Sequence, residues 1–194
     1  MNMKFYLKIS SMLVAAAFLS TLPVEAQTFR QTKQGITGTT QGMDIEIQFV
    51  SPEIVRVVKA PEGRSFTKKS LSVVKSPESM SVTTEKKGET VSLKSNAVRV
   101  DFNVETGRIS FFDKQGKALF TEKDYGAQFT PFNDAGNQTF SVRQAFLLDK
   151  DEAIYGLGQQ QVDDLNQRNH KHFMRQRALH ASVPIIQSTK GYGM

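Results

Sequence analysis

Apolar and polar residues alternate along several stretches of the chain, and this period of two is typical of β-strands with one buried and one solvated face. Residues 43–49 place Met, Ile and Phe between Asp, Glu and Gln. The turn Ser51-Pro52-Glu53 leads into a second apolar stretch at 54–58. We therefore predict a β-hairpin over this region.

A three-stranded meander is predicted further along the chain. Apolar residues alternate with Arg, Asp and Asn over residues 98–104. Thr106-Gly107 and Lys114-Gln115-Gly116 supply the turns, since glycine adopts the positive φ that such turns require. The three strands are expected at 98–104, 108–112 and 118–120.

The remaining strand signals are weaker. Residues 140–148 predict another strand with a less regular pattern. Residues 61–70 and 75–90 are rich in Ser, Lys, Glu and Gly and are predicted as loops. No stretch after residue 26 carries an apolar stripe with a period of 3.6, so the pattern favours an all-β sandwich. Three shorter strand candidates, expected nearer an edge, are 71–74, 81–84 and 91–93.

The N-terminus has the features of a secretory signal peptide. Lys4 and Lys8 precede an apolar run at 12–22, and Val24-Glu25-Ala26 places small residues at the cleavage positions. We therefore expect residues 1–26 to be removed and the protein to be periplasmic or secreted, with no membrane association after cleavage. The alternative is an uncleaved anchor, but the run is shorter than the roughly 20 residues that span a bilayer.

Composition and charge narrow the picture of the mature chain. Residues 27–42 are polar and are predicted to form a loose arm, which leaves 43–194 for the sandwich domain. The sequence has no Cys, so an exported form must rely on burial and sheet pairing rather than disulfides. The formal net charge is +6, but basic and acidic residues are interleaved. This indicates an evenly solvated surface, and no nucleic-acid partner is expected.

Paired carboxylates are the first candidates for acid–base catalysis. Acidic residues are dense at Asp149-Lys150-Asp151-Glu152 and at Asp163-Asp164. We interpret both as solvated surface turns, so no catalytic residue is assigned.

Metal and cofactor sites have weak candidates. His170 and His172 would share a face of a strand, but a metal site would need a third ligand at a suitable distance and no Cys is available. Gly156-x-Gly158 lacks the third glycine of a dinucleotide loop. No metal and no cofactor are expected, and these glycines are predicted to let the backbone turn tightly where a strand enters a long loop.

Four motifs near the C-terminus occur in a characteristic order. They are Asp151-Glu152-x-Ile154-Tyr155-Gly156-Leu157-Gly158, Leu165-Asn166-Gln167-Arg168, Pro184 to Ser188 and Lys190-Gly191-Tyr192-Gly193. In this order they resemble the end of the N-terminal β-sandwich domain of glycoside hydrolase family 31, which holds α-glucosidases and α-xylosidases. Residues 46–59 and 98–119 are also similar to the family's early hairpin and meander, so the resemblance covers residues 43–194.

The resemblance implies a galactose-mutarotase-like β-sandwich, all-β and mostly antiparallel. In the family a (β/α)8 barrel follows this domain and carries both catalytic Asp residues, which have no counterpart here. The chain is therefore expected to be the non-catalytic N-terminal domain of an exported retaining α-glycosidase, inactive alone. Gln159-Gln160 and Leu165 to Arg168 look closer to the α-xylosidase-like branch.

The expected partners and site residues also come from the resemblance. The partners are an oligosaccharide with α-linked xylose or glucose, and the missing catalytic barrel. A loop that approaches the sugar pocket in relatives would fall within Gln159 to Arg168, which makes Gln160 and Asn166 the candidate substrate-binding residues. The alternative is that these amides satisfy the loop's own backbone. Asn169 stands where Gly is common in the family, and Asn tolerates positive φ.

Two other interpretations stay open. The chain can be a free-standing carbohydrate-binding or interaction protein, although it has no Trp and four Tyr to offer as sugar platforms. It can also be a truncated gene product without independent activity. An exposed apolar face near the C-terminus would favour truncation, because a catalytic barrel would otherwise cover it.

Overall fold

The computed structural model describes residues 29–65, 70–159 and 164–194. These described residues form twelve strands and no helix, which confirms the all-β prediction. No described segment therefore offers a helix long and apolar enough to cross a membrane. The predicted signal peptide and Gln160 lie outside the described residues.

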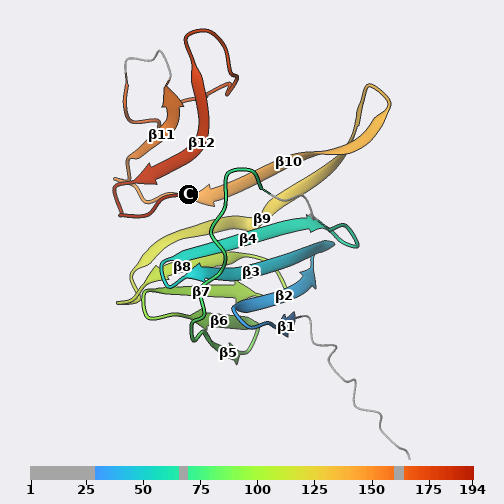
Figure 1. Cartoon of the computed structure of the whole chain (residues 1–194), viewed down its shortest axis with the longest axis vertical. Coiled ribbons are helices and arrows are strands. Elements are labelled where there is room, and N and C mark those ends of the chain that lie inside the picture. Colours follow the sequence, from blue (N-terminus) through green and yellow to red (C-terminus); the bar gives the residue numbers. More distant parts are fainter. Residues whose placement is uncertain (1–28, 66–69, 160–163) are drawn as a thin grey trace, which may run out of the picture.

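The body of the molecule is a sandwich of two antiparallel sheets (Figure 1). The first sheet has the order β1-β2-β3-β4 and the second has the order β10-β9-β8-β7-β6-β5. The first four strands are β1 (Phe29–Gln31), β2 (Gly35–Thr40), β3 (Met43–Ser51) and β4 (Ile54–Pro61). The second sheet holds β5 (Thr83–Lys87), β6 (Thr90–Lys94), β7 (Val98–Asn103), β8 (Ile109–Asp113), β9 (Ala118–Asp134) and β10 (Asn137–Leu147).

The core lies between the two sheets. Alternate residues of β3 and β7 are inaccessible to solvent because their period of two sends every second side chain inward. The predicted hairpin and meander are confirmed, and Gly107 and Gly116 adopt the positive φ values of 71° and 84° that their turns require. The largest fully buried side chains are Phe49, Phe102, Ile36, Ile47, Leu93, Ile109, Val91 and Val100.

The predicted loose arm at 27–42 is wrong for residues 29–40, which form β1 and β2. β2 pairs with β3 in a register that places Ile36 opposite Ile47, and Ile36 is 1% exposed. The alternation of β2 escaped detection because its inward positions are filled mostly by small residues. The sandwich therefore begins at residue 29 in the described part of the chain.

Two further expectations are corrected in the middle of the chain. Residues 71–74 form no strand, and Leu71 and Val74 are 96% and 91% exposed. The expected loop at 75–90 contains β5. The candidate at 91–93 is β6, the second strand from the edge of its sheet, and its Val91 and Leu93 are fully buried.

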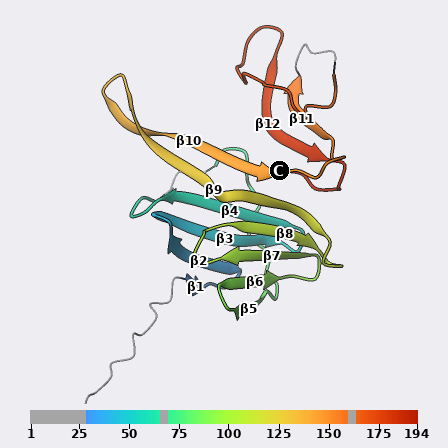
Figure 2. The same ribbon diagram turned by 180° about the vertical axis from the view of Figure 1, so that it is seen from behind.

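The hairpin of β9 and β10 is much longer than the two predicted segments. Its distal half, residues 128–143, projects beyond the sandwich with most side chains exposed (Figure 2). Its turn is tight, with Ala135 and Gly136 both at positive φ. We call this extension the β9–β10 arm.

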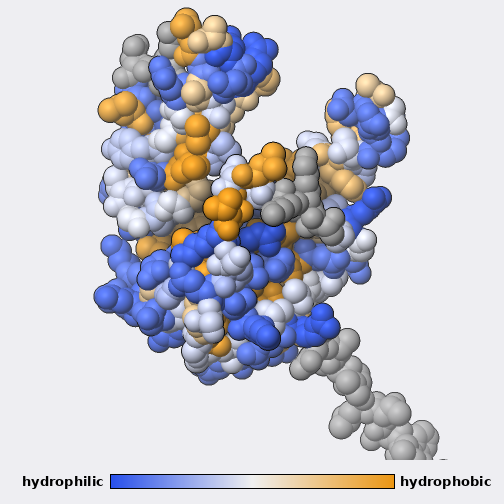
Figure 3. All heavy atoms as spheres, in the orientation of Figure 1, coloured by the Kyte–Doolittle hydropathy of each residue, from blue (hydrophilic) through white to orange (hydrophobic). Residues whose placement is uncertain are grey.

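The C-terminal part of the chain forms a separate two-stranded sheet of β11 (Ile154–Gln159) and β12 (Ala181–Ser188). This C-terminal hairpin rises beside the sandwich, on the same side as the β9–β10 arm (Figure 1). The space-filling view shows a hollow between the two extensions (Figure 3).

Candidate functional site

A groove of about 830 Å³ lies on the open side of the sandwich, where the edge strand β4 faces β8, β9 and β10. Val55, Val57 and Lys59 of β4 line one wall, and the tail from Lys190 to Met194 lines its mouth. Figure 3 shows apolar surface in the region between the C-terminal hairpin and the arm. The opposite wall includes Phe111, Phe120, Phe129, Val142 and Phe146.

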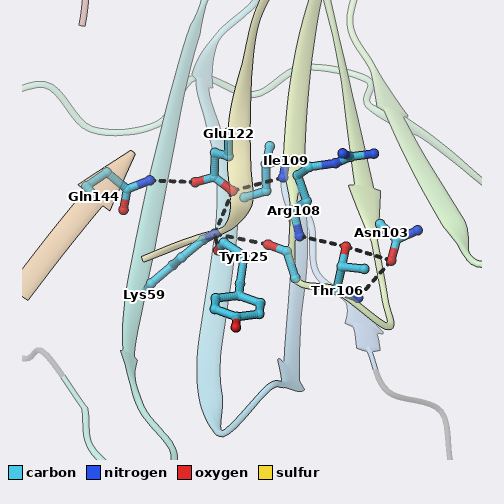
Figure 4. A network of polar contacts seen from close by, with 9 residues as sticks. Lys59, Asn103, Thr106, Arg108, Ile109, Glu122, Tyr125 and Gln144 are labelled. Carbon is cyan, nitrogen blue, oxygen red and sulfur yellow. Dashed lines mark hydrogen bonds and ion pairs between the residues drawn. The ribbon is translucent and has the colours of Figure 1, made fainter. Parts of the chain in front are cut away.

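An ion pair of Lys59 and Glu122 lies at the groove (Figure 4). Lys59 Nζ is 2.6 Å from Glu122 Oε2, and the two side chains are 5% and 4% exposed. The ammonium also donates to the carbonyls of Gly107 (3.0 Å) and Tyr125 (2.9 Å). The carboxylate accepts from Ile109 N (2.9 Å) and from Gln144 Nε2 (2.8 Å).

The surroundings of this pair shift the pKa of Lys59 and connect the pair to β9. Burial lowers the pKa of Lys59, and the charge of Glu122 partly offsets that effect. The strand β9 kinks beside the pair, where Asp124 and Gly126 adopt positive φ, and a Cβ on Gly126 would overlap the Glu122 carboxylate. Since Lys59 binds the Tyr125 carbonyl inside that kink, the pair fixes the point from which the arm departs.

The turn before β8 is tied to the same network. Asn103 Oδ1 accepts hydrogen bonds from Thr106 N (2.8 Å) and Thr106 Oγ1 (2.9 Å). These bonds hold the turn that presents the Gly107 carbonyl to Lys59, as Figure 4 shows in part. Sequence reasoning missed the network, because Lys59 and Glu122 are 63 positions apart and no local pattern connects them.

A second network is centred on Glu152, just before the C-terminal hairpin. Its carboxylate accepts from Ser188 Oγ (2.5 Å), Tyr192 Oη (2.5 Å) and Asp149 N (2.9 Å). Burial alone would raise the pKa of Glu152, but these hydrogen bonds hold it below its ordinary value. Burial and the bond to Glu152 raise the pKa of Tyr192.

Arg168 and Lys190 belong to two other motifs, and both bind the turn at residues 149–152. Arg168 Nη1 donates to the carbonyls of Asp149 (2.5 Å) and Glu152 (2.7 Å). Lys190 Nζ is 2.8 Å from Asp149 Oδ2, and this bond lowers the pKa of Asp149. The motifs that lie apart in sequence thus converge on residues 149–152.

The interpretation of residues 149–152 as a solvated turn is therefore wrong for Glu152, which is 3% exposed. Its acidic neighbours Asp149 and Asp151 are exposed, as predicted. Asp164 is also exposed and lies 3.4 Å from His170 Nε2, while Asp163 is outside the described residues. The local sequence gave no signal that distinguished Glu152, because its partners come from residues 36 and 40 positions later.

The candidate substrate-binding residue Asn166 has a backbone role in the described part of its loop. Asn166 Oδ1 accepts from Ile154 N (3.1 Å) and from Arg168 N (3.1 Å), so this oxygen ties the loop to β11. The side chain is exposed on the molecule as described. Its proposed contact with sugar remains a prediction, as does that of Gln160.

The glycines of β11 behave as expected. Gly156 and Gly158 adopt φ values of 116° and 81°, and the register with β12 shifts between them. A Cβ on either residue would overlap a carbonyl oxygen of β12. Asn169 has a φ of 62°, which confirms that Asn sustains the turn at that position.

The described residues hold no cluster of His, Cys, Asp and Glu that could bind a metal ion. His170 and His172 do not lie on a strand, although their rings stack at 6.1 Å. Neither residue therefore supports the strand-face geometry considered for a metal pair.

Each carboxylate in the described part of the groove accepts a hydrogen bond from a nearby group of the protein. Glu122 binds Lys59, Asp113 Oδ1 caps the turn at Gln115 N and Lys117 N, and Glu53 accepts from Ser51. Elsewhere, the charge of Glu89 raises the pKa of Glu105, but both lie on solvated turns outside the groove. A retaining glycosidase needs two free carboxyl groups that lie about 5 Å from each other and flank the glycosidic bond, and the groove offers no such arrangement among its described residues.

Comparisons with known proteins agree with this geometry. The family model described as the glycosyl hydrolase 31 N-terminal galactose mutarotase-like domain matches residues 44–194. An α-xylosidase from Saccharolobus solfataricus is 28% identical over 162 residues, which cover 78% of this chain and 22% of that protein.

Two solved structures have the same fold. The α-xylosidase of Xanthomonas citri matches with a TM-score of 0.79 and 31% identity, covering 84% of this chain and 18% of that one. An α-xylosidase from a soil metagenome, solved with xylose, matches with a TM-score of 0.73 and 25% identity, covering 85% of this chain and 27% of that one.

The chain thus spans about a fifth to a quarter of the length of these relatives. The family model covers most of the described residues, including those that build the Glu152 network. The chain belongs to glycoside hydrolase family 31, as a galactose-mutarotase-like N-terminal domain.

Proposed function

We propose that this chain serves as the non-catalytic N-terminal domain of an exported retaining α-glycosidase, with α-xylosidase as its activity. The observation that carries the proposal is the exposed apolar surface of the C-terminal hairpin, which is attached to the sandwich through Tyr192. Tyr155, Val183 and Ile185 are 40%, 40% and 55% exposed on this hairpin. Val183 and Ile185 share a face of β12, and exposed apolar patches are typical of docking surfaces.

The position of the hairpin is set by the Glu152 network. Tyr192 binds Glu152 and stacks on Phe120 of β9 at 4.8 Å, so the tail joins the hairpin to the sandwich. Arg168 anchors the loop between β11 and β12 to the same turn. These contacts support a rigid docking face rather than a free strand pair.

The reaction itself would belong to the docked catalytic domain. Retention of anomeric configuration requires a nucleophilic carboxylate and an acid/base carboxylate, which form and then hydrolyse a covalent glycosyl intermediate. This chain would contribute a wall of the sugar pocket through the loop that contains Asn166. α-Linked xylose is favoured as substrate because both solved relatives named above are α-xylosidases.

A chimeric enzyme tests the proposal. The chain would replace the matching region of the Xanthomonas citri α-xylosidase, and hydrolysis of 4-nitrophenyl α-xyloside would be measured. We expect the chimera to retain kcat/KM within about two orders of magnitude, since the substituted domain supplies no reacting group. The chain alone should show no turnover above background.

Two outcomes would contradict the proposal. One is robust turnover by the chain alone, and the other is a chimera that folds and stays soluble but has no activity. Calorimetry of the chain with xylose-containing oligosaccharides tests the alternative of a free-standing binder. Tight binding without a catalytic domain would favour that alternative.

The role of Asn166 can be separated from its structural one within the chimera. Asn166→Asp keeps an oxygen acceptor for the two backbone N–H groups, whereas Asn166→Ala removes it. A sugar contact through the amide would raise KM in both variants. A purely structural role would raise it in Asn166→Ala alone.

A further inference from the structure

The groove is bounded by two strand edges that have no partner strand among the described residues. β4 ends the first sheet and pairs with β3, and β10 ends the second sheet and pairs with β9. A free edge presents a row of backbone N–H and C=O groups that can pair with another strand. As far as residues 29–65, 70–159 and 164–194 show, the sandwich is therefore open along this side.

The chemistry of the groove selects an apolar occupant. Val55 and Val57 point from β4 toward the core side, and aromatic rings from β8, β9 and β10 face them. Its buried charges, Lys59 and Glu122, neutralise one another and are also bonded to backbone groups (Figure 4). The buried charges of the described wall are therefore paired and call for no ionic ligand.

The tail of the chain reaches the mouth of the groove without filling it. Met194 exchanges backbone hydrogen bonds with Ile186 of β12 at 2.9 and 2.7 Å, and it lines the groove. In the matched Xanthomonas citri and metagenome enzymes, this chain corresponds to 18% and 27% of a longer polypeptide. A long additional segment is thus present in those enzymes.

We infer that the groove is the seat of an extended segment of the catalytic-domain polypeptide, which pairs with the free edge of β4 and inserts an apolar side chain at every second position. β4 has eight residues, so at roughly 3.3 Å per residue a partner strand of similar length would close the groove. Main-chain pairing supplies affinity and the apolar wall supplies register, as in other cases of strand addition. The inference rests on the proposed function, since it names the partner segment of the docking domain.

Peptide binding and hydrogen exchange test the inference on the chain itself. Synthetic fifteen-residue peptides would tile the Xanthomonas citri α-xylosidase sequence after its matched region, each with a fluorescent label for anisotropy. We expect a peptide with alternating apolar residues to bind and to slow amide exchange in β4. If no peptide slows amide exchange in β4, the inference is overturned. If the slowing is confined to the β11–β12 hairpin, the docking site lies there instead.

A matched pair of variants on β10 adds a second measurement. Val142 is 59% exposed and lines the groove, whereas Leu147 is 50% exposed on the same strand and does not line it. Both tolerate a polar residue without loss of core packing. Val142→Asp should weaken peptide binding about tenfold or more, because it buries an unpaired charge, and Leu147→Asp should change it by less than about twofold.

The outcomes separate this inference from the proposed function. Equal effects of the two variants would contradict strand insertion. An active chimera whose β4 amides exchange as fast as those of the isolated chain would overturn the groove inference and leave the proposed function standing. Dimerisation of the isolated chain that Val142→Asp abolishes would instead identify a second copy as the occupant and overturn it.

Discussion

Glu122 and Glu152 are both almost inaccessible to solvent, yet the fold uses them differently. Glu122 faces a cation, whereas Glu152 faces two hydroxyl groups and a backbone N–H. Each joins segments that are distant in sequence: Glu122 joins β4, β8 and β10 to β9, and Glu152 joins the tail to the start of the C-terminal hairpin. Removing either carboxylate should therefore loosen a junction between elements rather than a single strand.

The lowered pKa of Glu152 predicts a specific pH dependence of stability. A carboxyl group whose folded pKa lies below its unfolded value of about 4.3 stabilises the fold above that value and loses this contribution as the pH falls through the folded pKa. Glu152→Gln should remove this acid sensitivity and cost about 1–3 kcal/mol at neutral pH, because two hydroxyl donors lose their charged acceptor. Urea unfolding between neutral pH and about pH 3 measures both effects.

Asp151→Asn is the matched control for Glu152→Gln. Asp151 is the exposed neighbour in the same turn, and its neutralisation should leave the pH dependence unchanged. If Glu152→Gln lost stability with acid as steeply as the unmodified chain, the carboxylate would not be the group that titrates.

The Lys59–Glu122 pair should show strong coupling in a double-mutant cycle. Lys59→Met leaves a buried carboxylate without its cation and should cost about 3–5 kcal/mol of unfolding free energy. Glu122→Gln leaves the ammonium uncompensated and should also destabilise. The double variant should cost less than the sum of the two, as measured by urea denaturation, and additivity within about 0.5 kcal/mol would show that the pair is not coupled.

At the scale of strands and turns, the sequence predicts elements well where alternation is strong and turns need glycine. β3 and β7 show the strong alternation, and Gly107 and Gly116 lie in the turns that bound β8. β2 was missed because small residues fill its inward positions, and 71–74 was mistaken for a strand because a short apolar run without alternation does not specify pairing.

For the candidate site, the sequence shows the motifs but not the contacts between them. Its motifs were visible in the sequence, and their resemblance to a family identified the fold. The convergence of Glu152, Arg168 and Tyr192 was not visible, because it depends on contacts over 16 to 40 positions. The length of the β9–β10 arm was also hidden, since an arm with two exposed faces needs no apolar alternation.

Gly158 offers a prediction about the C-terminal hairpin. It adopts a φ of 81°, and a Cβ there would overlap the Ala181 carbonyl of the paired strand. Gly158→Ala should therefore disrupt pairing of β11 with β12 and cost about 1–3 kcal/mol from backbone strain and lost hydrogen bonds. Hydrogen exchange should accelerate in β11 and β12 while β3 and β7 stay protected.

Gly193→Ala is the control for this substitution. A Cβ on Gly193 meets the Ile186 carbonyl at 3.5 Å, which is ordinary van der Waals contact. It should leave exchange in the hairpin nearly unchanged. Equal acceleration in the two variants would mean that the tight approach at Gly158 does not govern the pairing.

At the scale of the whole molecule, a two-layer sandwich carries two extensions of a single layer, the β9–β10 arm and the C-terminal hairpin (Figures 1 and 2). A two-stranded sheet is marginally stable in water by itself. The hairpin persists because the Phe120–Tyr192 stack and the Glu152 network attach it to the sandwich. Its outer residues are therefore available to a partner without being needed for folding.

This separation of folding from docking predicts the behaviour of a surface variant. Val183→Thr with Ile185→Thr replaces two exposed apolar side chains on β12 by residues that also favour strands, so the unfolding free energy should change by less than about 0.5 kcal/mol each. The isolated chain should become less prone to self-association, measured by light scattering, because its exposed apolar area shrinks. In the Xanthomonas citri chimera the same variant should lower the thermal midpoint and the activity, since the docking face would lose contacts. The control is Leu71→Thr with Val74→Thr, because these apolar residues are more exposed and lie outside the hairpin. This control should leave the thermal midpoint and the activity of the chimera unchanged. A β12 variant that behaved like the control would show that the hairpin is not the docking face.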